Sequence, residues 1–267
     1  MTTTVTEINA FTGGRFGGNP AGVCLPPSKL SDADMQSIAA QMNLSETAFI
    51  FSEKDGFRIR WFTPKMEVKL CGHATLASAF FLWDSGLVTG NRITFHSLSG
   101  VLSADRNGDK ISLNFPAKPS YTEDFHKEIK STFGIKPIFT GKSEFDYLIE
   151  FADEAAIKNL KPDFKKIETI QARGIIVTAR SASPDYDFVS RFFAPAVGVN
   201  EDPVTGSAHC TLAPYWSAKT GKTKMTGFQA SERGGVVEVE LKNGRVLLTG
   251  EAEKVRTLSV ENGVVKF

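Results

Sequence analysis

Cysteine is scarce in this chain of 267 residues, and the three that occur, Cys24, Cys71 and Cys210, cannot all pair within one molecule. None of them falls in a Cys-x-x-Cys frame, so the sequence indicates neither a disulfide framework nor a redox motif. Reduced thiols are typical of cytoplasmic proteins, and residues 1–7 lack the basic and apolar regions of a signal peptide. We therefore expect a cytoplasmic protein.

Long apolar runs and an excess of one charge are also absent. The most apolar stretch, residues 74–83, is too short to span a bilayer and is followed by Asp84. The 31 basic and 30 acidic residues are spread evenly, which argues against nucleic acid or an anionic membrane as the main partner. Because 41% of the residues are hydrophobic, the chain has ample material for a packed core.

The pattern of elements predicts an α+β protein. Ser31 is a good cap for a helix that ends near Asn43, and residues 74–84 predict a second helix that is apolar nearly all round and hence buried. Glycines crowd residues 11–22 without a GK[ST] or GxGxxG motif, so we expect a tight loop there. Short strands joined by turns dominate both ends of the chain, with the last ones at 235–242, 245–249, 255–260 and 264–267.

An internal repeat divides the sequence. Residues 57–64 (FRIRWFTP) and 188–195 (FVSRFFAP) share Phe, Arg, Phe and Pro in register. Each copy is followed by a loop, a glycine (Gly72 or Gly206) and a mostly apolar helix that ends at another glycine. Gly72 aligned with Gly206 gives an offset of 134, whereas HATLA aligned with HCTLA gives 136, so the register of the helix starts is left open.

Duplication predicts two pseudo-symmetric lobes, each a twisted, mostly antiparallel sheet or barrel around one buried central helix. We place the N-terminal lobe at residues 1–117 and the C-terminal lobe at 118–255, with the last strand, near 256–267, able to return to the first lobe. A ligand is expected in the cleft where the two helix N-termini converge.

The segment EDPVTGSAH, residues 201–209, leads into the second apolar helix. A Gly-Ser turn before a helix leaves backbone N–H groups that favour a bound anion, and Asp202 is close enough in sequence to reach the same pocket. The alternative is a polar turn in which Ser207 is only a helix N-cap.

Four segments together resemble the phenazine-biosynthesis PhzF-like family, whose fold is that of diaminopimelate epimerase. They are GNPAGV (18–23), NLSETAF (43–49), LCGHATLA (70–77) and EDPVTGSAH (201–209), and they span nearly the whole chain in the family order. The resemblance implies a homodimeric isomerase that uses no cofactor. It moves a proton between carbons of a small carboxylate, as in the isomerisation of trans-2,3-dihydro-3-hydroxyanthranilate.

The same resemblance assigns the site residues. Glu46 corresponds to the catalytic acid/base, and His73 and Asp202 correspond to further catalytic residues that also bind and polarise the substrate. Gly72, Gly206 and Ser207 complete the expected substrate-binding set, since glycines allow close backbone approach and helix N-termini hold carboxylates. No metal is expected.

Three alternatives remain open. An amino-acid epimerase or racemase of this fold uses one cysteine from each lobe, but here Asp202 and Ser207 stand where the second thiol is needed. A non-catalytic carboxylate-binding protein could keep the fold. A metal site built from Cys71, His73, His209 and Cys210 matches no usual zinc spacing.

Overall fold

The computed structural model describes residues 3–14 and 16–267, and the protein has an α+β fold of two compact units. Unit 1 comprises the described residues up to Asn114 together with Thr249–Phe267, and unit 2 comprises Phe115–Leu248. Among the helices of these described residues, none combines the length and the apolar character that a membrane crossing requires.

Unit 1 is a closed barrel of eight strands. Around the barrel each strand pairs with the next, and the last pairs with the first. In this order the strands are β1 (Thr3–Thr12), β2 (Asn19–Cys24), β3 (Glu46–Glu53), β4 (Gly56–Phe62), β6 (Arg92–Ser97), β7 (Gly100–Asn107), β8 (Lys110–Pro116) and β16 (Arg245–Glu261). Two short strands also pair with strands of the barrel, β5 (Glu67–Val68) with β4 and β17 (Val264–Lys266) with β16.

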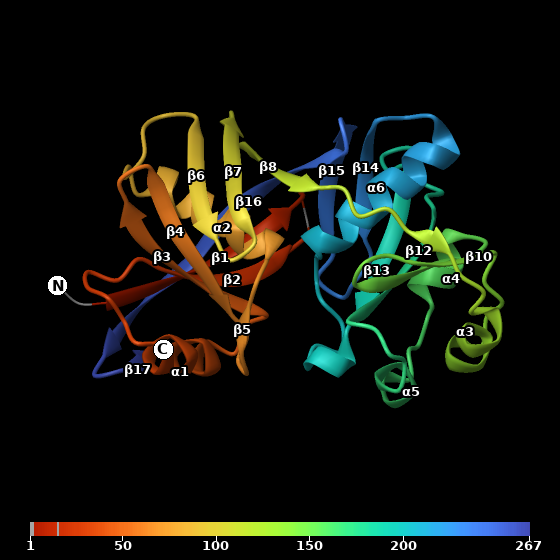
Figure 1. Cartoon of the computed structure of the whole chain (residues 1–267), viewed down its shortest axis with the longest axis horizontal. Coiled ribbons are helices and arrows are strands. Elements are labelled where there is room, and N and C mark those ends of the chain that lie inside the picture. The colour runs from red at the N-terminus through yellow and green to blue at the C-terminus, as the bar shows by residue number, and fades with distance from the viewer. Residues whose placement is uncertain (1–2, 15) are drawn as a thin grey trace. The chain divides into compact units, whose positions relative to one another are not determined.

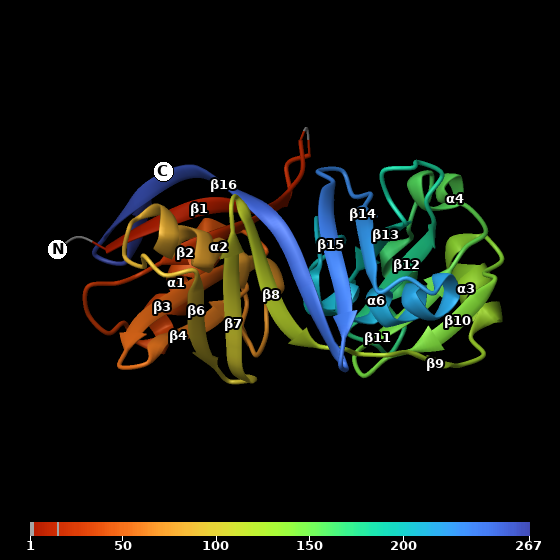
Figure 2. The same cartoon turned by 90° about the horizontal axis from the view of Figure 1, so that it is seen from above.

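Helix α2 (Gly72–Asp84) fills the interior of this barrel (Figures 1 and 2). It is apolar nearly all round, as its sequence predicts, and ten of its residues are buried. Helix α1 (Asp32–Met42) lies outside, and its buried face packs against β3 and the end of the chain. The predicted cap is confirmed, because the Ser31 hydroxyl accepts a hydrogen bond from the Asp34 amide.

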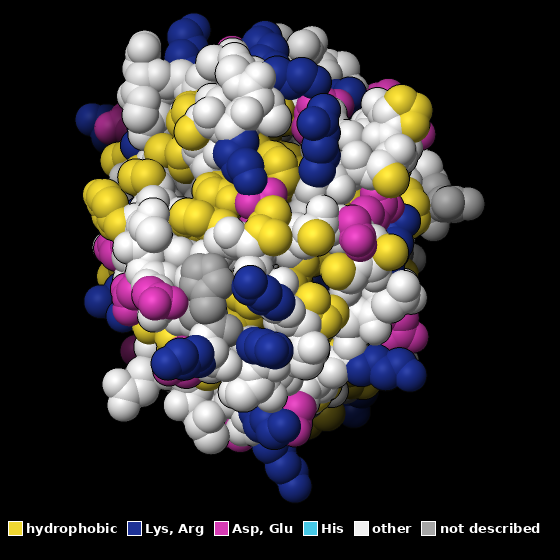
Figure 3. Space-filling model, turned by 90° about the vertical axis from the view of Figure 1, so that its right-hand side faces the viewer, with side chains coloured by type: hydrophobic (Ala, Val, Ile, Leu, Met, Phe, Trp, Pro, Cys, Tyr) yellow, Lys and Arg dark blue, Asp and Glu magenta, His cyan; other side chains and the backbone are white. Residues whose placement is uncertain are grey.

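Unit 2 repeats this arrangement around helix α6 (Gly206–Thr220). Its strands, in pairing order, are β9 (Tyr121–Thr122), β10 (Phe139–Lys142), β11 (Asp146–Glu150), β12 (Gly174–Arg180), β13 (Phe188–Phe193), β14 (Lys224–Gln229), β15 (Gly235–Lys242) and the start of β16. The smaller helical segments are α3 (His126–Phe133), α4 (Glu154–Lys158), α5 (Phe164–Glu168) and η1 (Pro195–Val197). On the face shown in Figure 3, basic and acidic side chains are interspersed with apolar ones.

The pairing pattern supports the predicted duplication. From β1 to β7, successive pairs are antiparallel, parallel, antiparallel, parallel and antiparallel, and the pairs from β10 to β15 follow the same series. The repeated segments are β4 and β13. Their shared arginines make the same two-point ion pair, Arg60 with Glu67 and Arg191 with Glu201, with N–O distances of 2.7–2.8 Å. Because each glutamate lies five residues before the helix glycine, the offset of 134 is the structural one.

Two of the predicted local features are wrong. The glycine-rich segment 11–22 is not one loop, since β1 continues to Thr12 and β2 begins at Asn19. The separate strands expected at 245–249 and 255–260 form one strand of 17 residues. The polar residues between these two segments made them look like separate strands in the sequence. In the structure, β16 belongs to unit 2 up to Leu248 and then pairs with β1 in unit 1.

Candidate active site

Glu46 occupies the first position of β3. Helix α1 is followed by its C-cap Asn43, whose left-handed backbone (φ 50°) turns the chain. Strand β3 then runs parallel to β2, with Glu46 opposite Ala21. Its side chain keeps 18% of its surface exposed. The apolar residues that follow anchor the strand in the core, so the carboxylate is held at the end of a rigid element while solvent still reaches it.

His73 is the second residue of α2 and is almost completely buried. Its Nε2 lies 3.3 Å from Glu46 Oε2, close enough for a charged or polar contact. The contact is not aligned as a hydrogen bond, and Nε2 has no other hydrogen-bond partner among the described residues. Glu46 and His73 therefore face each other with donor capacity on the imidazole still unused.

Asn19 determines which nitrogen of the neutral imidazole carries the proton. Its Nδ2, which can only donate, lies 3.2 Å from His73 Nδ1. Nδ1 is thus the acceptor, and the proton of the neutral ring is on Nε2, on the side of Glu46. Burial lowers the pKa of His73 to about 3, so the ring is neutral at physiological pH.

The GNPAGV segment is what brings Asn19 to this position. Gly18 has a φ of +60°, and a Cβ there would lie 2.4 Å from the Ala10 carbonyl oxygen, so no other residue fits without displacing β1. Sequence analysis quoted this segment as part of the resemblance and assigned no role to Asn19. An amide directly after a glycine at a strand start was the available signal.

Cys71 is the N-cap of α2, and its sulfur lies 3.5 Å from His73 Nδ1. Glu46, Cys71 and His73 offer ligand atoms that all lie within 4.8 Å of one another, so this trio could hold a metal ion. Such an ion could use only one nitrogen of His73, and Asn19 already occupies Nδ1. This trio is not the metal site considered from the sequence, which joined Cys71 and His73 to His209 and Cys210. The last two residues belong to unit 2.

Asp202 lies in the loop before α6 and is 9% exposed. Its Oδ2 accepts a hydrogen bond of 2.6 Å from the Thr205 hydroxyl. The buried amide of Gln229 binds the loop at both ends, donating to the Asp202 carbonyl at 2.7 Å and accepting from the Thr205 amide at 2.8 Å. Gln229, which sequence analysis missed, therefore fixes the loop that carries Asp202.

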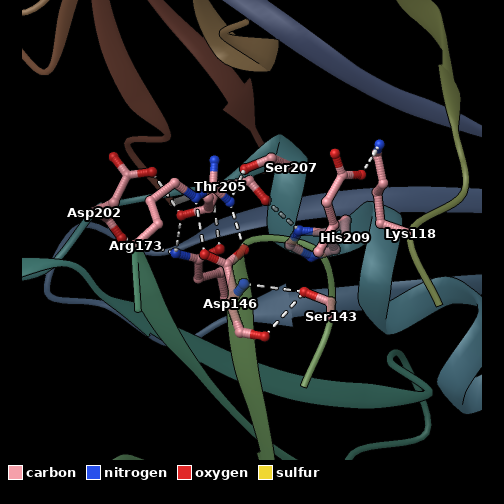
Figure 4. Close-up of polar contacts among 10 residues, drawn as sticks. Lys118, Ser143, Asp146, Arg173, Asp202, Thr205, Ser207 and His209 are labelled. Carbon is pink, nitrogen blue, oxygen red and sulfur yellow. Dashed lines mark hydrogen bonds and ion pairs between the residues drawn. The ribbon is translucent and has the colours of Figure 1, made fainter. Parts of the chain in front are cut away.

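Ser207 is the second residue of α6, the same place that His73 holds in α2. The N-cap is Thr205, so the interpretation of Ser207 as a simple cap is wrong. The Ser207 hydroxyl accepts a hydrogen bond of 3.1 Å from Nη2 of Arg173 (Figure 4). Gly206 opens the helix, and its backbone and that of Ser207 lie in the first turn, where amides have no partner within the helix.

Arg173 is a second residue that the sequence did not single out. It stands directly before β12 and makes a two-point ion pair with Asp146, the first residue of β11, at 2.8 and 2.5 Å. Asp146 is 2% exposed. Burial raises the pKa of its carboxyl group, and the bonds from Arg173 oppose that rise.

His209 and Cys210 are buried in unit 2. The Nδ1 of His209 donates to the Thr205 carbonyl at 2.8 Å, and burial lowers the pKa of this histidine to about 4. Burial raises the pKa of Cys210 to about 12, so its thiol is protonated at neutral pH.

The predicted site residues thus form two groups within the units. Glu46, Gly72 and His73 lie together in unit 1, and Asp202, Gly206 and Ser207 lie together in unit 2. Each group stands at the start of the central helix of its unit. The unit 1 group adds a carboxylate, and the unit 2 group adds an arginine held by an aspartate.

Known proteins similar to this chain include isomerases and PhzF-family phenazine biosynthesis proteins. An uncharacterized isomerase of Halalkalibacterium halodurans is 49% identical over 96% of this chain and 97% of its own length. The crystal structure of a PhzF-family phenazine biosynthesis protein of Enterococcus faecalis superposes with a TM-score of 0.93 at 37% identity, covering 98% of this chain and 100% of that one.

More distant structures share the fold alone. A probable proline racemase of Agrobacterium radiobacter matches 98% of this chain and 93% of its own with a TM-score of 0.65 at 10% identity. The sequence profile described as phenazine biosynthesis-like protein matches residues 8–257. This chain therefore belongs to the PhzF-like family of phenazine biosynthesis-like proteins, an isomerase family with an epimerase-like fold.

Proposed function

We propose that the protein is a cofactor-independent isomerase that moves a proton between carbons of a small carboxylate-bearing substrate, with Glu46 as the acid/base. The substrate type is that of trans-2,3-dihydro-3-hydroxyanthranilate, the reaction implied by the family resemblance. The observation that carries the proposal is the placement of the part-exposed Glu46 carboxylate 3.3 Å from the neutral, buried imidazole of His73.

A single carboxylate suffices for this reaction. Glu46 takes a proton from one carbon, the electron pair of the broken C–H bond moves into the adjacent π system, and Glu46 returns the proton to another carbon. Proton transfer by a positioned side chain contributes about 10²–10⁴-fold to a rate. The overall reaction balances, because the glutamate ends in the state in which it began.

His73 is assigned a different part. With a pKa of about 3 it is a poor proton acceptor at neutral pH. The proton on Nε2 faces Glu46 instead, so the imidazole orients the carboxylate and stabilises charge that develops beside it. Asn19 keeps the ring in that tautomer.

Substrate binding is assigned to Gly72 and His73 and to the unit 2 group. The first-turn amides of α6 at Gly206 and Ser207 suit a carboxylate oxygen, since a helix N-terminus favours negative charge. Asp202, nearly buried and held by Thr205, suits an amino or hydroxyl group of the substrate. We assign the protein to the cytoplasm on its three free cysteines and to a homodimer on the family resemblance, and size-exclusion chromatography tests the latter.

Two other functions are less well supported. A two-thiol epimerase needs a second reactive cysteine, but Cys210 is buried with its pKa raised to about 12. A binding protein without activity has no need of a carboxylate beside a tautomer-fixed histidine. It would bind carboxylates without exchanging their hydrogen with solvent.

The test is solvent-deuterium exchange with trans-2,3-dihydro-3-hydroxyanthranilate and related cyclic amino acids, in the presence of a chelator. The wild type should incorporate deuterium at one defined carbon, and E46Q should lose about 10²–10⁴-fold of that rate while keeping its melting temperature. E53Q is the matched control, because Glu53 ends the same strand, where it pairs with the exposed Arg58. Wild-type turnover by E46Q would refute the assignment.

A further inference from the structure

Arg173 contacts Ser207, one of the proposed substrate-binding residues, and the proposed function gives Arg173 itself no role. The guanidinium group can only donate hydrogen bonds, so its 3.1 Å contact makes Ser207 Oγ the acceptor. The hydroxyl hydrogen of Ser207 must then point to some other acceptor. A serine in this state is prepared to donate to an anionic oxygen.

The guanidinium is itself held firmly. Asp146 binds it at two points, and its side chain lies over the rings of Phe145 and Phe192, with centroid distances of 5.2 and 5.7 Å. The backbone amide of Arg173 also donates to the Phe145 carbonyl at 3.1 Å. These contacts leave Arg173 little freedom, and Figure 4 shows it between Asp146 and Ser207. About a third of its side chain stays exposed.

The corresponding positions of unit 1 carry the proposed acid/base group. Asn19 begins β2 and Glu46 begins β3, while Asp146 begins β11 and Arg173 directly precedes β12. Both pairs are separated by 27 residues. In unit 1 both Asn19 and Glu46 meet His73, the second residue of the central helix. In unit 2 Arg173 meets Ser207, the second residue of its helix, and Asp146 binds Arg173.

We propose that Arg173 is a positioning residue that sets Ser207 as a hydrogen-bond donor for the carboxylate of the substrate. Asp146 holds Arg173 in place, and the charge of Arg173 favours an anionic partner beside Ser207. The inference rests on the proposed function for the identity of the ligand, but the effect of Arg173 on Ser207 is measurable without any substrate.

The test replaces Ser207 by cysteine and titrates the introduced thiol by its ultraviolet absorbance as a thiolate. The wild type, titrated in parallel, supplies the background of the three natural cysteines, all of which are at most 6% exposed. In S207C/R173M the thiol pKa should be higher than in S207C by about 1–3 units, the usual effect of one opposite charge at this range. R173K, which restores the charge, should recover part of the difference in the S207C background.

The variant S207C/R191M distinguishes a direct effect of Arg173 on residue 207 from a general effect on the fold of unit 2. Arg191 makes an equally well-formed ion pair with Glu201 in the same unit, so its loss perturbs the fold without touching Ser207. This control should leave the thiol pKa where S207C has it. Equal thiol pKa values in S207C and S207C/R173M would overturn the inference, as would an equal rise in the Arg191 control.

The substrate arm uses the deuterium assay. R173M and S207A should each raise KM with little change in kcat, and the double variant should be no worse than S207A alone, because Arg173 acts through Ser207. Additive losses would overturn the inference. If the thiol pKa rises in S207C/R173M as expected but the wild type shows no deuterium exchange, the proposed function is refuted and the inference about Arg173 stands.

Discussion

Units 1 and 2 share one plan and differ in what they place at the start of the central helix. Unit 1 sets a carboxylate beside a buried neutral imidazole, whereas unit 2 sets an aspartate-held arginine beside a serine hydroxyl. The supporting ion pairs, Arg60 with Glu67 and Arg191 with Glu201, are the same in both. Duplication has therefore kept the scaffold while the residues at the helix starts differ, and the proposed function assigns proton transfer to one unit and anion binding to the other.

Loss of His73 breaks the arrangement proposed for unit 1. H73A removes the donor that faces Glu46 and the partner of Asn19, so we expect kcat to fall about 100-fold, within the range seen when one polarising group is lost. The wild-type pH–rate profile should show no titration of His73 above about pH 4, since its pKa is about 3. An acidic limb that disappears in H73N would contradict the neutral-donor role.

The shared ion pairs give a second comparison. R191M should lower the free energy of unfolding by about 3 kcal/mol, because removal of one partner leaves Glu201 largely buried and unpaired. R60M should cost less, since the Arg60 pair is more exposed. Urea unfolding measures both. A larger loss in R60M would show that burial does not govern this repeated contact.

Acid should weaken the protein through its buried histidines. The pKa values of His73 and His209 are lowered from 6.5 to about 3 and about 4, so below pH 6.5 the unfolded chain takes up protons that the folded protein does not. The contribution of these two histidines to the free energy of unfolding is fully present above pH 6.5. It should decline as the pH falls toward 4, by about 1.4 kcal/mol per pH unit for each histidine.

The unit 1 counterpart of His209 offers a matched variant. Thr75 donates to the Cys71 carbonyl as His209 donates to the Thr205 carbonyl, each bonding the N-cap of its helix. H209T should keep that bond and lose the titrating ring. The slope of stability against pH between 6.5 and 4 should therefore be about half that of the wild type, and an unchanged slope would show that His209 does not contribute.

Much of this architecture could be predicted from the sequence, because it depends on local pattern. The apolar character of residues 74–83 predicts a buried helix, and the repeated FxxRxF segments predict two similar barrels. The register of the repeat was ambiguous, since the shared ion pair that settles it joins residues on different elements.

The supporting residues of the site were the part that sequence did not reveal. Asn19, Arg173 and Gln229 are polar residues at strand ends, where a solvated side chain is the usual outcome. Their roles arise from contacts with residues 24 to 54 positions away, which pairing of distant strands alone brings about. The ring nitrogen that carries the proton of His73 likewise depends on Asn19 and could not be read from the motif that contains the histidine.

The most direct test of the division of labour is deuterium incorporation over a range of substrate concentrations in the wild type, E46Q and S207A. If unit 1 moves the proton and unit 2 holds the carboxylate, E46Q will be slower by about 10²–10⁴-fold at every concentration. S207A will approach the wild-type rate when the substrate is saturating. Exchange by E46Q at the wild-type rate, or a loss in S207A that saturation does not relieve, would contradict the account.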